Sequence, residues 1–253
     1  MQQYLNIFQH LATEHFRQDR AVSEPISAKN LTEVVDFSLG FEGADIDALE
    51  QAASQYLTYQ PDSAQVDFFK LLYSGRNDPA LFGDWITSLS NANMHTYQMS
   101  PVATLMEQEL INQWNRLIGF TTDSKTGDGI MVSGGSQANL IGMMMARHHA
   151  CPELKTKGST SQKLVAFVSD QAHYSGQKAV NVLGIGTDNL IAVASDDQGR
   201  LCPAALSEAI ELSIKQGHKP FYIGLTAGTT VLGAFDPVPE CRAIADKYNI
   251  WLH

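Results

Sequence analysis

The second half of the chain alternates between short apolar segments and longer amphipathic segments, and this alternation constrains the fold more than any other feature. The apolar segments predict strands at residues 129–132, 163–168, 190–194, 221–226 and from 250 onward. The amphipathic segments between them predict helices at residues 136–149, 176–183, 203–215 and 238–248. Strands and helices that alternate at this spacing form βαβ units. We therefore expect an α/β fold, with a mostly parallel sheet covered by helices on both faces.

The first 93 residues lack this alternation and are typical of helices joined by loops. Helices are predicted to start near Asn30, near Ala44 and after Pro79. Apolar residues then recur at helical spacing from Pro101 to Ile118, which predicts an amphipathic helix with proline in its first turn. We expect two parts, a helical N-terminal segment at 1–95 and an α/β domain at 96–253. The chain stops inside a predicted central strand, so we expect this domain to be incomplete at its C-terminus.

Composition and charge exclude several classes of partner. The chain has 27 acidic and 17 basic residues, a formal net charge of −10 and no basic run, whereas nucleic-acid binding needs clustered Lys and Arg. Its three cysteines have no CxxC spacing, so we expect neither a disulfide framework nor a metal site. The sequence shows no signal peptide and no segment near the roughly 18 apolar residues of a membrane span. We expect a cytoplasmic protein without a nucleic-acid or membrane partner.

A pair of glycines followed by a serine lies between a predicted strand and a predicted helix. In the run from Ser133 to Leu140, Gly134 and Gly135 would let a ligand approach the backbone, and Ser136 opens the helix. The free N–H groups and partial positive charge of a helix N-terminus suit a phosphate. The run is neither GxGxxG nor a P-loop, because no lysine follows the glycines. A tight turn with a capping serine explains the same residues, so both interpretations stay open.

Two further runs also follow predicted strands. His173 comes shortly after the strand at 163–168, and a segment rich in small and hydroxyl residues, Thr226 to Thr230, follows a later strand. The carboxyl ends of parallel strands form the ligand-binding edge of an open α/β sheet. We therefore expect these residues and Ser136 to share one edge. Each run also has a structural explanation, as a histidine packed at a helix start or as an ordinary turn.

Taken together, the runs resemble a known family, the group II pyridoxal-phosphate (PLP) dependent amino-acid decarboxylases. The resemblance rests on SGGSQANLIGMMMAR, SDQAHYSGQKAVNVLGIGTD and TAGTTVLGAFDPVPECRAIADKYNIWLH. The start of the family's large domain, closest to the glutamate decarboxylase branch, resembles NANMHTYQMSPVATLMEQEL. The resemblance runs from about Phe68 to the last residue. It implies the aspartate-aminotransferase-like fold (fold type I), in which a helical N-terminal segment helps to join two subunits into a homodimer.

The resemblance also implies roles for particular residues. Gly134, Gly135 and Ser136 match the loop that holds the phosphate of PLP. His173 matches a histidine that stacks on the pyridine ring of the cofactor, and Thr230 matches a threonine beside the cofactor. Cofactor-binding roles are therefore expected at these five positions, with His173 as the candidate catalytic residue.

Two functional positions of the family have no counterpart in this chain. One is an aspartate two positions beyond the residue that matches His253, which pairs with the pyridine nitrogen. The other is a later lysine that forms the Schiff base with PLP. We expect the natural protein to continue past His253 with both residues, and the 253-residue chain by itself to be inactive.

The substrate implied by the resemblance is an acidic L-amino acid, either glutamate converted to γ-aminobutyrate or aspartate converted to β-alanine. Glutamate decarboxylases carry Phe-Asn-Gln-Leu where this chain has Phe69-Lys70-Leu71-Leu72. A site that hydrogen-bonds its substrate discriminates strongly, so Leu71, a candidate substrate-binding residue, counts against glutamate. Cysteine sulfinate and diaminobutyrate are lesser candidates. Another fold-type I PLP lyase or transferase, or a non-catalytic α/β binding module, stays open because fold does not fix function.

Overall fold

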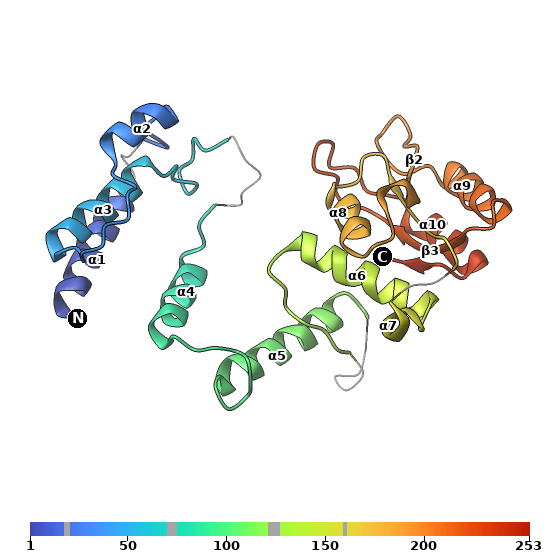
Figure 1. The fold of residues 1–253 in the computed structure, drawn as a ribbon, viewed down its shortest axis with the longest axis horizontal. Helices are drawn as coiled ribbons and strands as arrows, with labels where there is room; N and C mark the ends of the chain where they lie inside the picture. The colour runs from blue at the N-terminus through green and yellow to red at the C-terminus, as the bar shows by residue number, and fades with distance from the viewer. Residues whose placement is uncertain (18–20, 70–74, 121–126, 159–160) are drawn as a thin grey trace. The chain divides into compact units, whose positions relative to one another are not determined.

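The computed structural model describes residues 1–17, 21–69, 75–120, 127–158 and 161–253 (Figure 1). Within these residues the chain forms two compact units, Met1–Thr104 and Leu105–His253. The division predicted from the sequence, a dimerising segment at 1–95 followed by a cofactor domain at 96–253, is a division by function and stays a prediction.

The N-terminal unit is helical, as its sequence predicts. Its helices are α1 (Gln2–His15), α2 (Ala28–Val34), α3 (Ile46–Tyr59) and α4 (Asp78–Ser90). A fifth helix, α5 (Pro101–Leu117), begins in this unit and continues into the next one. Pro101 is the first residue of α5, where its missing N–H costs no helical hydrogen bond.

Side chains cap three of the N-terminal helices. The capping residues are Ser27 for α2, Asp45 for α3 and Asn77 for α4. Each side chain accepts a hydrogen bond from the backbone N–H three residues later, at 3.1, 2.8 and 3.0 Å respectively. The helix predicted near Asn30 is present and begins at Ala28, but its cap is Ser27 and Asn30 donates to it.

Few side chains of the N-terminal unit are buried. No residue of α1, α2, α3 or α4 is fully covered. Among the described residues before Leu105, only Asp62 and Ser100 are buried. The aromatic ring of Trp85 lies edge-on to that of Phe8, with 5.5 Å between their centroids, but Trp85 keeps 38% of its surface exposed. This unit therefore has almost no apolar core of its own.

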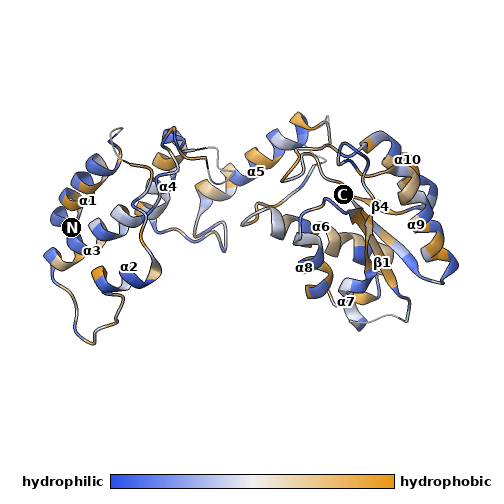
Figure 2. Cartoon of the chain, turned by 90° about the horizontal axis from the view of Figure 1, so that it is seen from above, coloured by the Kyte–Doolittle hydropathy of each residue, from blue (hydrophilic) through white to orange (hydrophobic). Residues whose placement is uncertain are grey.

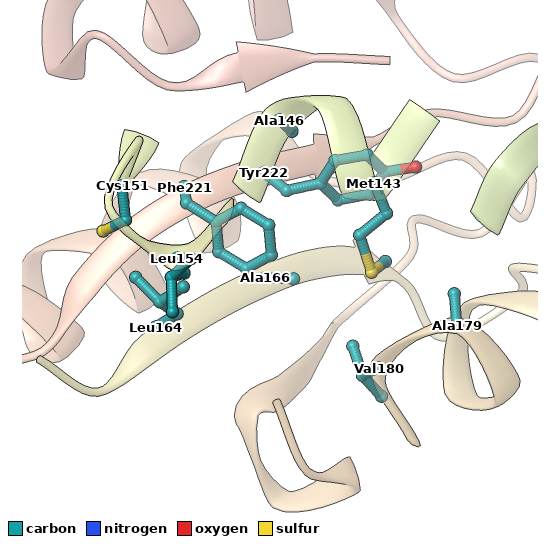
Figure 3. Close-up of a cluster of buried hydrophobic side chains, with 10 residues drawn as sticks. All are labelled: Met143, Ala146, Cys151, Leu154, Leu164, Ala166, Ala179, Val180, Phe221 and Tyr222. Carbon is teal, nitrogen blue, oxygen red and sulfur yellow. The ribbon is translucent and has the colours of Figure 1, made fainter. Parts of the chain in front are cut away.

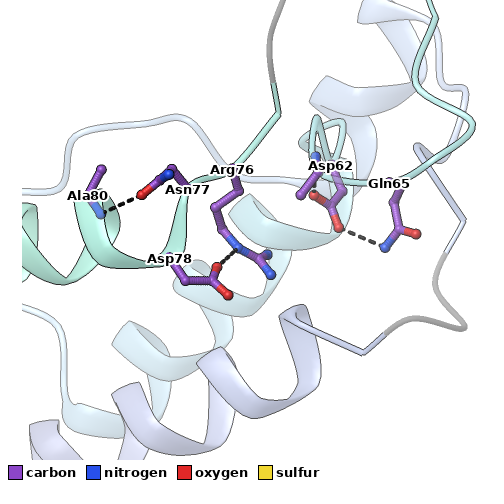
Figure 4. A network of polar contacts seen from close by, with 7 residues as sticks. Asp62, Gln65, Arg76, Asn77, Asp78 and Ala80 are labelled. Atoms are coloured by element: carbon purple, nitrogen blue, oxygen red, sulfur yellow. Dashed lines mark hydrogen bonds and ion pairs between the residues drawn. The ribbon is translucent and has the colours of Figure 1, made fainter.

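Polar contacts organise the segment between α3 and α4 (Figure 4). Asp62 accepts hydrogen bonds from the backbone N–H of Ala64 and from the side-chain amide of Gln65, at 3.0 and 2.9 Å. Arg76 pairs with Asp78 at 2.7 Å. Burial opposes the ionisation of Asp62, but these two hydrogen bonds together with the charges of His15 and Arg76 outweigh it, so the pKa of the carboxyl lies below its ordinary value.

The C-terminal unit is a parallel sheet with flanking helices. In chain order its further elements are α6 (Gly135–Ala150), α7 (Leu154–Lys157), β1 (Leu164–Ser169), α8 (Ser175–Val182), the 3-10 turn η1 (Thr187–Asn189), β2 (Leu190–Val193), α9 (Pro203–Lys215), β3 (Lys219–Gly224), α10 (Val238–Tyr248) and β4 (Trp251–Leu252). The strands lie in the order β2-β1-β3-β4 and every pair is parallel. The predicted α/β fold with a parallel sheet is confirmed.

One predicted strand is wrong. Residues 129–132 lie outside the sheet, and Ile130 and Met131 are exposed. The backbone N–H of Met131 donates to the carboxylate of Glu107 in α5 at 2.9 Å, and the N–H of Gly129 donates to the side chain of Asp128. Backbone N–H groups need hydrogen-bond acceptors, and here side chains provide them. The segment therefore needs no neighbouring strand.

Successive residues of β1 supply two separate hydrophobic clusters. Leu164 and Ala166 belong to a cluster with residues of α6 and α8 on one face of the sheet (Figure 3). Val165 and Phe167 belong to a second cluster, formed with α9 and α10 on the other face. The period of two follows from the pleat of a strand. Because both faces are covered, β1 reads as a continuous apolar run, which is typical of a parallel sheet.

Hydropathy follows the same arrangement. Figure 2 shows β1 in the orange of hydrophobic residues, while the helices around the sheet show both orange and blue. The helices are thus amphipathic and cover the sheet with their apolar sides. None of the described helices is long and apolar enough to cross a lipid bilayer.

Candidate functional site

Several polar segments meet where the strands of the sheet end. The turn after β1 carries His173, the loop after β3 carries Thr226 to Thr230, and His253 follows β4 directly. The N-terminal part of α6 lies at the same edge, because its Asn139 contacts the imidazole of His253. This is the ligand-binding edge of an open α/β sheet.

The Gly134–Gly135–Ser136 turn is open on the surface. All three residues are exposed, and a side chain built on either glycine would meet no atom within 4 Å. The N–H groups of Gln137 and Ala138 bond to the carbonyl of Gly134, whereas those of Gly135 and Ser136 donate to no described residue. The first turn of α6 contains no acidic side chain. Two free donors at a helix N-terminus without a competing carboxylate form a suitable anion site.

Ser136 does not cap α6, which contradicts the interpretation of this run as a tight turn with a capping serine. The N-cap residue is Gly134, which has no side chain to offer. Instead, Ser133 and Gln137 close the turn, because the Ser133 hydroxyl and backbone N–H both donate to Oε1 of Gln137, at 2.6 and 3.1 Å. The hydroxyl of Ser136 is left available to a ligand.

His173 is exposed beside the start of α8. Its Nδ1 accepts a hydrogen bond from the backbone N–H of Ser175 at 3.1 Å, and the ring of Tyr174 lies 4.2 Å away, centroid to centroid. Since Nδ1 is the acceptor, the proton of the neutral imidazole is on Nε2. The turn before it is held by Ser169, whose hydroxyl accepts from the N–H of Gln171.

Asn139 joins the turn after β1 to the end of β4. Its side-chain Nδ2 donates to the hydroxyl of Ser175 at 3.0 Å, and its Oδ1 lies 3.1 Å from Nε2 of His253. The imidazole of His253 stacks on the ring of Tyr222 and lies against Gly142 of α6. Although His253 as a residue is exposed, its imidazole is largely covered, and burial lowers its pKa.

Thr230 is exposed on the loop after β3, at the same edge of the sheet. No described hydrogen bond connects its side chain with Ser136 or His173. The loop itself is fixed by Asp236, 4% exposed, whose carboxylate accepts from the N–H groups of Leu201 and Thr226 at 2.8 and 2.7 Å. The predicted role of Thr230 beside a cofactor stays a prediction. The predicted substrate residue Leu71 lies outside the described residues.

Sequence reasoning missed Asn139, Ser175 and His253 as parts of the site. A signal was present in Gly142, a glycine in the interior of a predicted helix, which indicates a close approach by another group. A Cβ at this position would lie 2.5 Å from the His253 ring. The sequence indicated a close contact at Gly142 but did not identify His253 as the residue that makes it.

Comparison with known proteins gives this site a context. The family profile described as the pyridoxal-dependent decarboxylase conserved domain matches residues 29–253. The acidic amino acid decarboxylase GADL1 of Xenopus tropicalis is 35% identical over 236 residues, which are 93% of this chain and 45% of that protein. The crystal structure of mouse CSAD in apo form matches with a TM-score of 0.94 at 31% identity, covering 99% of this chain and 53% of that one.

A third relative was solved with a cofactor. The crystal structure of Oryza sativa TDC with PLP and tryptamine matches with a TM-score of 0.87 at 25% identity, covering 99% of this chain and 53% of that one. The chain thus spans about half the length of the relatives that it matches.

Proposed function

The chain belongs to the pyridoxal-dependent decarboxylase family and has its fold-type I architecture, and from this premise we propose that the protein carrying it removes the α-carboxylate of an acidic L-amino acid. PLP is the cofactor of the family. The observation that carries the proposal is the shared strand-end edge, at which an open Gly-Gly-Ser turn and His173 come together.

The open turn fits the phosphate of PLP. The phosphate is an anchor and takes no part in bond breaking, so it needs donors and space. Gly135 and Ser136 offer a hydroxyl and N–H groups that donate to no described residue, and no atom lies within 4 Å of a Cβ built on Gly134 or Gly135. We propose that Gly134, Gly135 and Ser136 bind the phosphate.

His173 and Thr230 are proposed to hold the ring of the cofactor. When bound, PLP supplies an electron sink for the electron pair that remains as the substrate carboxylate leaves as carbon dioxide. His173 orients that ring by stacking, and the hydrogen bond at its Nδ1 keeps the imidazole in one orientation. Thr230 would contact the cofactor from the loop after β3.

The acidic substrate class is supported by the relatives, and one residue bears on which acid is used. Three curated relatives that are 35% identical to this chain, from Xenopus tropicalis, human and cattle, are named acidic amino acid decarboxylases. Leu71 stands where glutamate decarboxylases have a glutamine, so we propose aspartate beside glutamate as the substrate, with cysteine sulfinate and diaminobutyrate as lesser candidates.

The test measures carbon dioxide release by the full-length, PLP-loaded protein from aspartate, glutamate, cysteine sulfinate, diaminobutyrate and tryptophan. We expect turnover with at least one acidic amino acid and none with tryptophan. The variant His173→Ala should lower kcat by at least tenfold with little change in the unfolding midpoint. Turnover of tryptophan alone, or no release from any of the five, would contradict the proposal.

We also propose a homodimer. Apolar side chains form a stripe along α5 and remain exposed, and they are Val102, Leu105, Met106, Leu110, Trp114 and Leu117. In the N-terminal unit Phe69, Phe82 and Trp85 are exposed as well. Apolar surface of this extent marks an interaction site. A cytoplasmic location stays a prediction from the sequence.

Light scattering on the eluting protein tests the dimer. We expect twice the chain mass for the unchanged protein and a single chain mass for the double variant Leu110→Glu, Trp114→Glu. The control Gln108→Glu places one such charge on the other side of α5 and should leave the dimer intact. A monomeric unchanged protein at micromolar concentration would overturn this proposal.

A further inference from the structure

We infer that Asn139 is a positioning residue that fixes the proton positions and orientations of two histidines, His173 and His253, at the strand-end edge. These three residues come from α6, from the turn after β1 and from the end of β4. Only the consequence for the cofactor rests on the proposed function, namely on the stacking role of His173.

The contact with His253 is direct. Its Nε2 lies 3.1 Å from Oδ1 of Asn139, and an amide oxygen can only accept, so Nε2 must carry a proton. The ring has little freedom to turn away, since it stacks on Tyr222 at 5.6 Å and touches the bare Cα of Gly142. Asn139 thus selects the Nε2–H tautomer of a covered imidazole.

The link to His173 runs through Ser175. The hydroxyl of Ser175, a residue 2% exposed, accepts from Nδ2 of Asn139 at 3.0 Å. The backbone N–H of the same serine donates to Nδ1 of His173 at 3.1 Å. Holding the serine therefore holds the donor that sets both the tautomer and the direction of the His173 ring.

An asparagine is suited to this place because it donates and accepts at once. A carboxylate would keep the contact with His253 but could only accept from the Ser175 hydroxyl, which reverses that hydrogen bond, and alanine would remove the hydrogen bond to both partners. A buried polar group without a partner costs free energy, so the neighbours would rearrange. The geometry thus explains why a side chain one turn away from the Gly-Gly-Ser loop bears on the site.

The test is nitrogen NMR of the two imidazoles in the protein without cofactor. In the unchanged protein we expect the neutral form of each ring to carry its proton on Nε2. In Asn139→Ala, His253 should lose its slowly exchanging Nε2–H and show a tautomer mixture, and the His173 signals should broaden or shift. Unchanged signals in Asn139→Ala, or a proton on Nδ1 of His253 in the unchanged protein, would overturn the inference.

Three further variants separate the links. Gly142→Ala should displace His253 alone, because the added methyl would lie 2.5 Å from its ring. Ser175→Ala removes the hydroxyl and should alter His173 while His253 keeps its partner, and it serves if Asn139→Ala fails to fold. The control is Asn181→Ala, an exposed asparagine on α8 whose side chain forms no described hydrogen bond. It should leave both imidazoles unchanged.

Cofactor binding then links the inference to function. By fluorescence titration, Asn139→Ala should bind PLP about threefold to tenfold more weakly, the effect of one or two lost hydrogen bonds. Altered imidazole signals with unchanged PLP affinity would support the positioning role and contradict the proposed stacking role of His173. Unchanged signals with weaker PLP binding would contradict the positioning role and leave the proposed function standing.

Discussion

The two units of this chain are stabilised in different ways. The C-terminal unit has two hydrophobic clusters, one on each face of its sheet. The N-terminal unit has neither, and no residue of α1 to α4 is buried. Conversely, α2, α3 and α4 have side-chain caps, whereas α6, α8, α9 and α10 have none. A helix that is stabilised by side-chain packing does not need a side-chain cap.

The difference also bears on the candidate site, whose described residues lie in the C-terminal unit. Asn139, His173 and His253 are fixed by a packed unit, so small polar contacts can hold them with little loss of order. The N-terminal helices, by contrast, expose apolar surface that a partner would have to cover. Under the proposed homodimer such a region would gain stability on association, while caps and polar turns set its local structure.

The largest expected effect is a loss in the free energy of unfolding when the hydrophobic core of the C-terminal unit is altered. Phe167 of β1 is fully buried between α9 and α10 on one side and the sheet on the other. Phe167→Ala should lower the free energy of unfolding by about 3–5 kcal/mol, through lost burial and a cavity. The matched change Phe82→Ala, at a ring that is 59% exposed, should change it by less than about 0.5 kcal/mol in the monomer. Urea denaturation followed by circular dichroism gives both values, and similar losses would remove the contrast between the units.

The next effect concerns buried carboxylates. Asp236 joins the loop after β3 to Leu201 by two hydrogen bonds, so Asp236→Ala leaves two covered N–H groups without a partner. We expect a loss of about 2–3 kcal/mol in the same measurement. Asp62→Ala is the matched change in the N-terminal unit and should cost about 1 kcal/mol or less, since its partners Ala64 and Gln65 reach solvent more easily. An equal cost at both positions would contradict this ranking.

Helix caps should matter only in the N-terminal unit. Asn77→Ala removes the acceptor for the N–H of Ala80 at the start of α4 and should destabilise that helix by about 1 kcal/mol. Hydrogen exchange of the first α4 amides measures the change. Asn77→Asp should restore protection, because aspartate caps as well. Unaltered exchange in Asn77→Ala would show that α4 is held by packing after all.

The smallest effect is a pH dependence of the N-terminal unit. Burial opposes ionisation of Asp62, yet its hydrogen bonds hold its pKa below the ordinary 3.8. A lowered pKa in the folded state means that the stabilisation is fully present above pH 3.8 and is lost as the pH falls below it through the folded-state pKa. The amide signals of Ala64 and Gln65 should follow this transition in an NMR titration. In Asp62→Asn the transition should vanish, and its persistence would assign it to another group.

Much of the fold was predictable because local pattern and tertiary structure agree. The bounds of α9 and α10 are those predicted, since each helix begins at or next to a proline and carries an apolar stripe for the sheet. The prediction of a strand at 129–132 was wrong because an apolar run is not specific to strands. Here the side chains of Glu107 and Asp128 accept hydrogen bonds from the backbone N–H groups of the segment. Three strand ends could be assigned to one edge, since parallel strands all finish at the same side.

The sequence by itself determined the fold class, the helical character of the first part and the candidate residues Gly134, Gly135, Ser136 and His173, because hydrophobic periodicity and turn chemistry are local. Only the tertiary structure decided that Asn139 meets Ser175, 36 residues away, and His253, 114 residues away. Those contacts depend on strand order and on how closely α6 approaches the sheet at Gly142. A hydrogen bond between distant residues is fixed by that packing to within tenths of an ångström, and no local pattern records it.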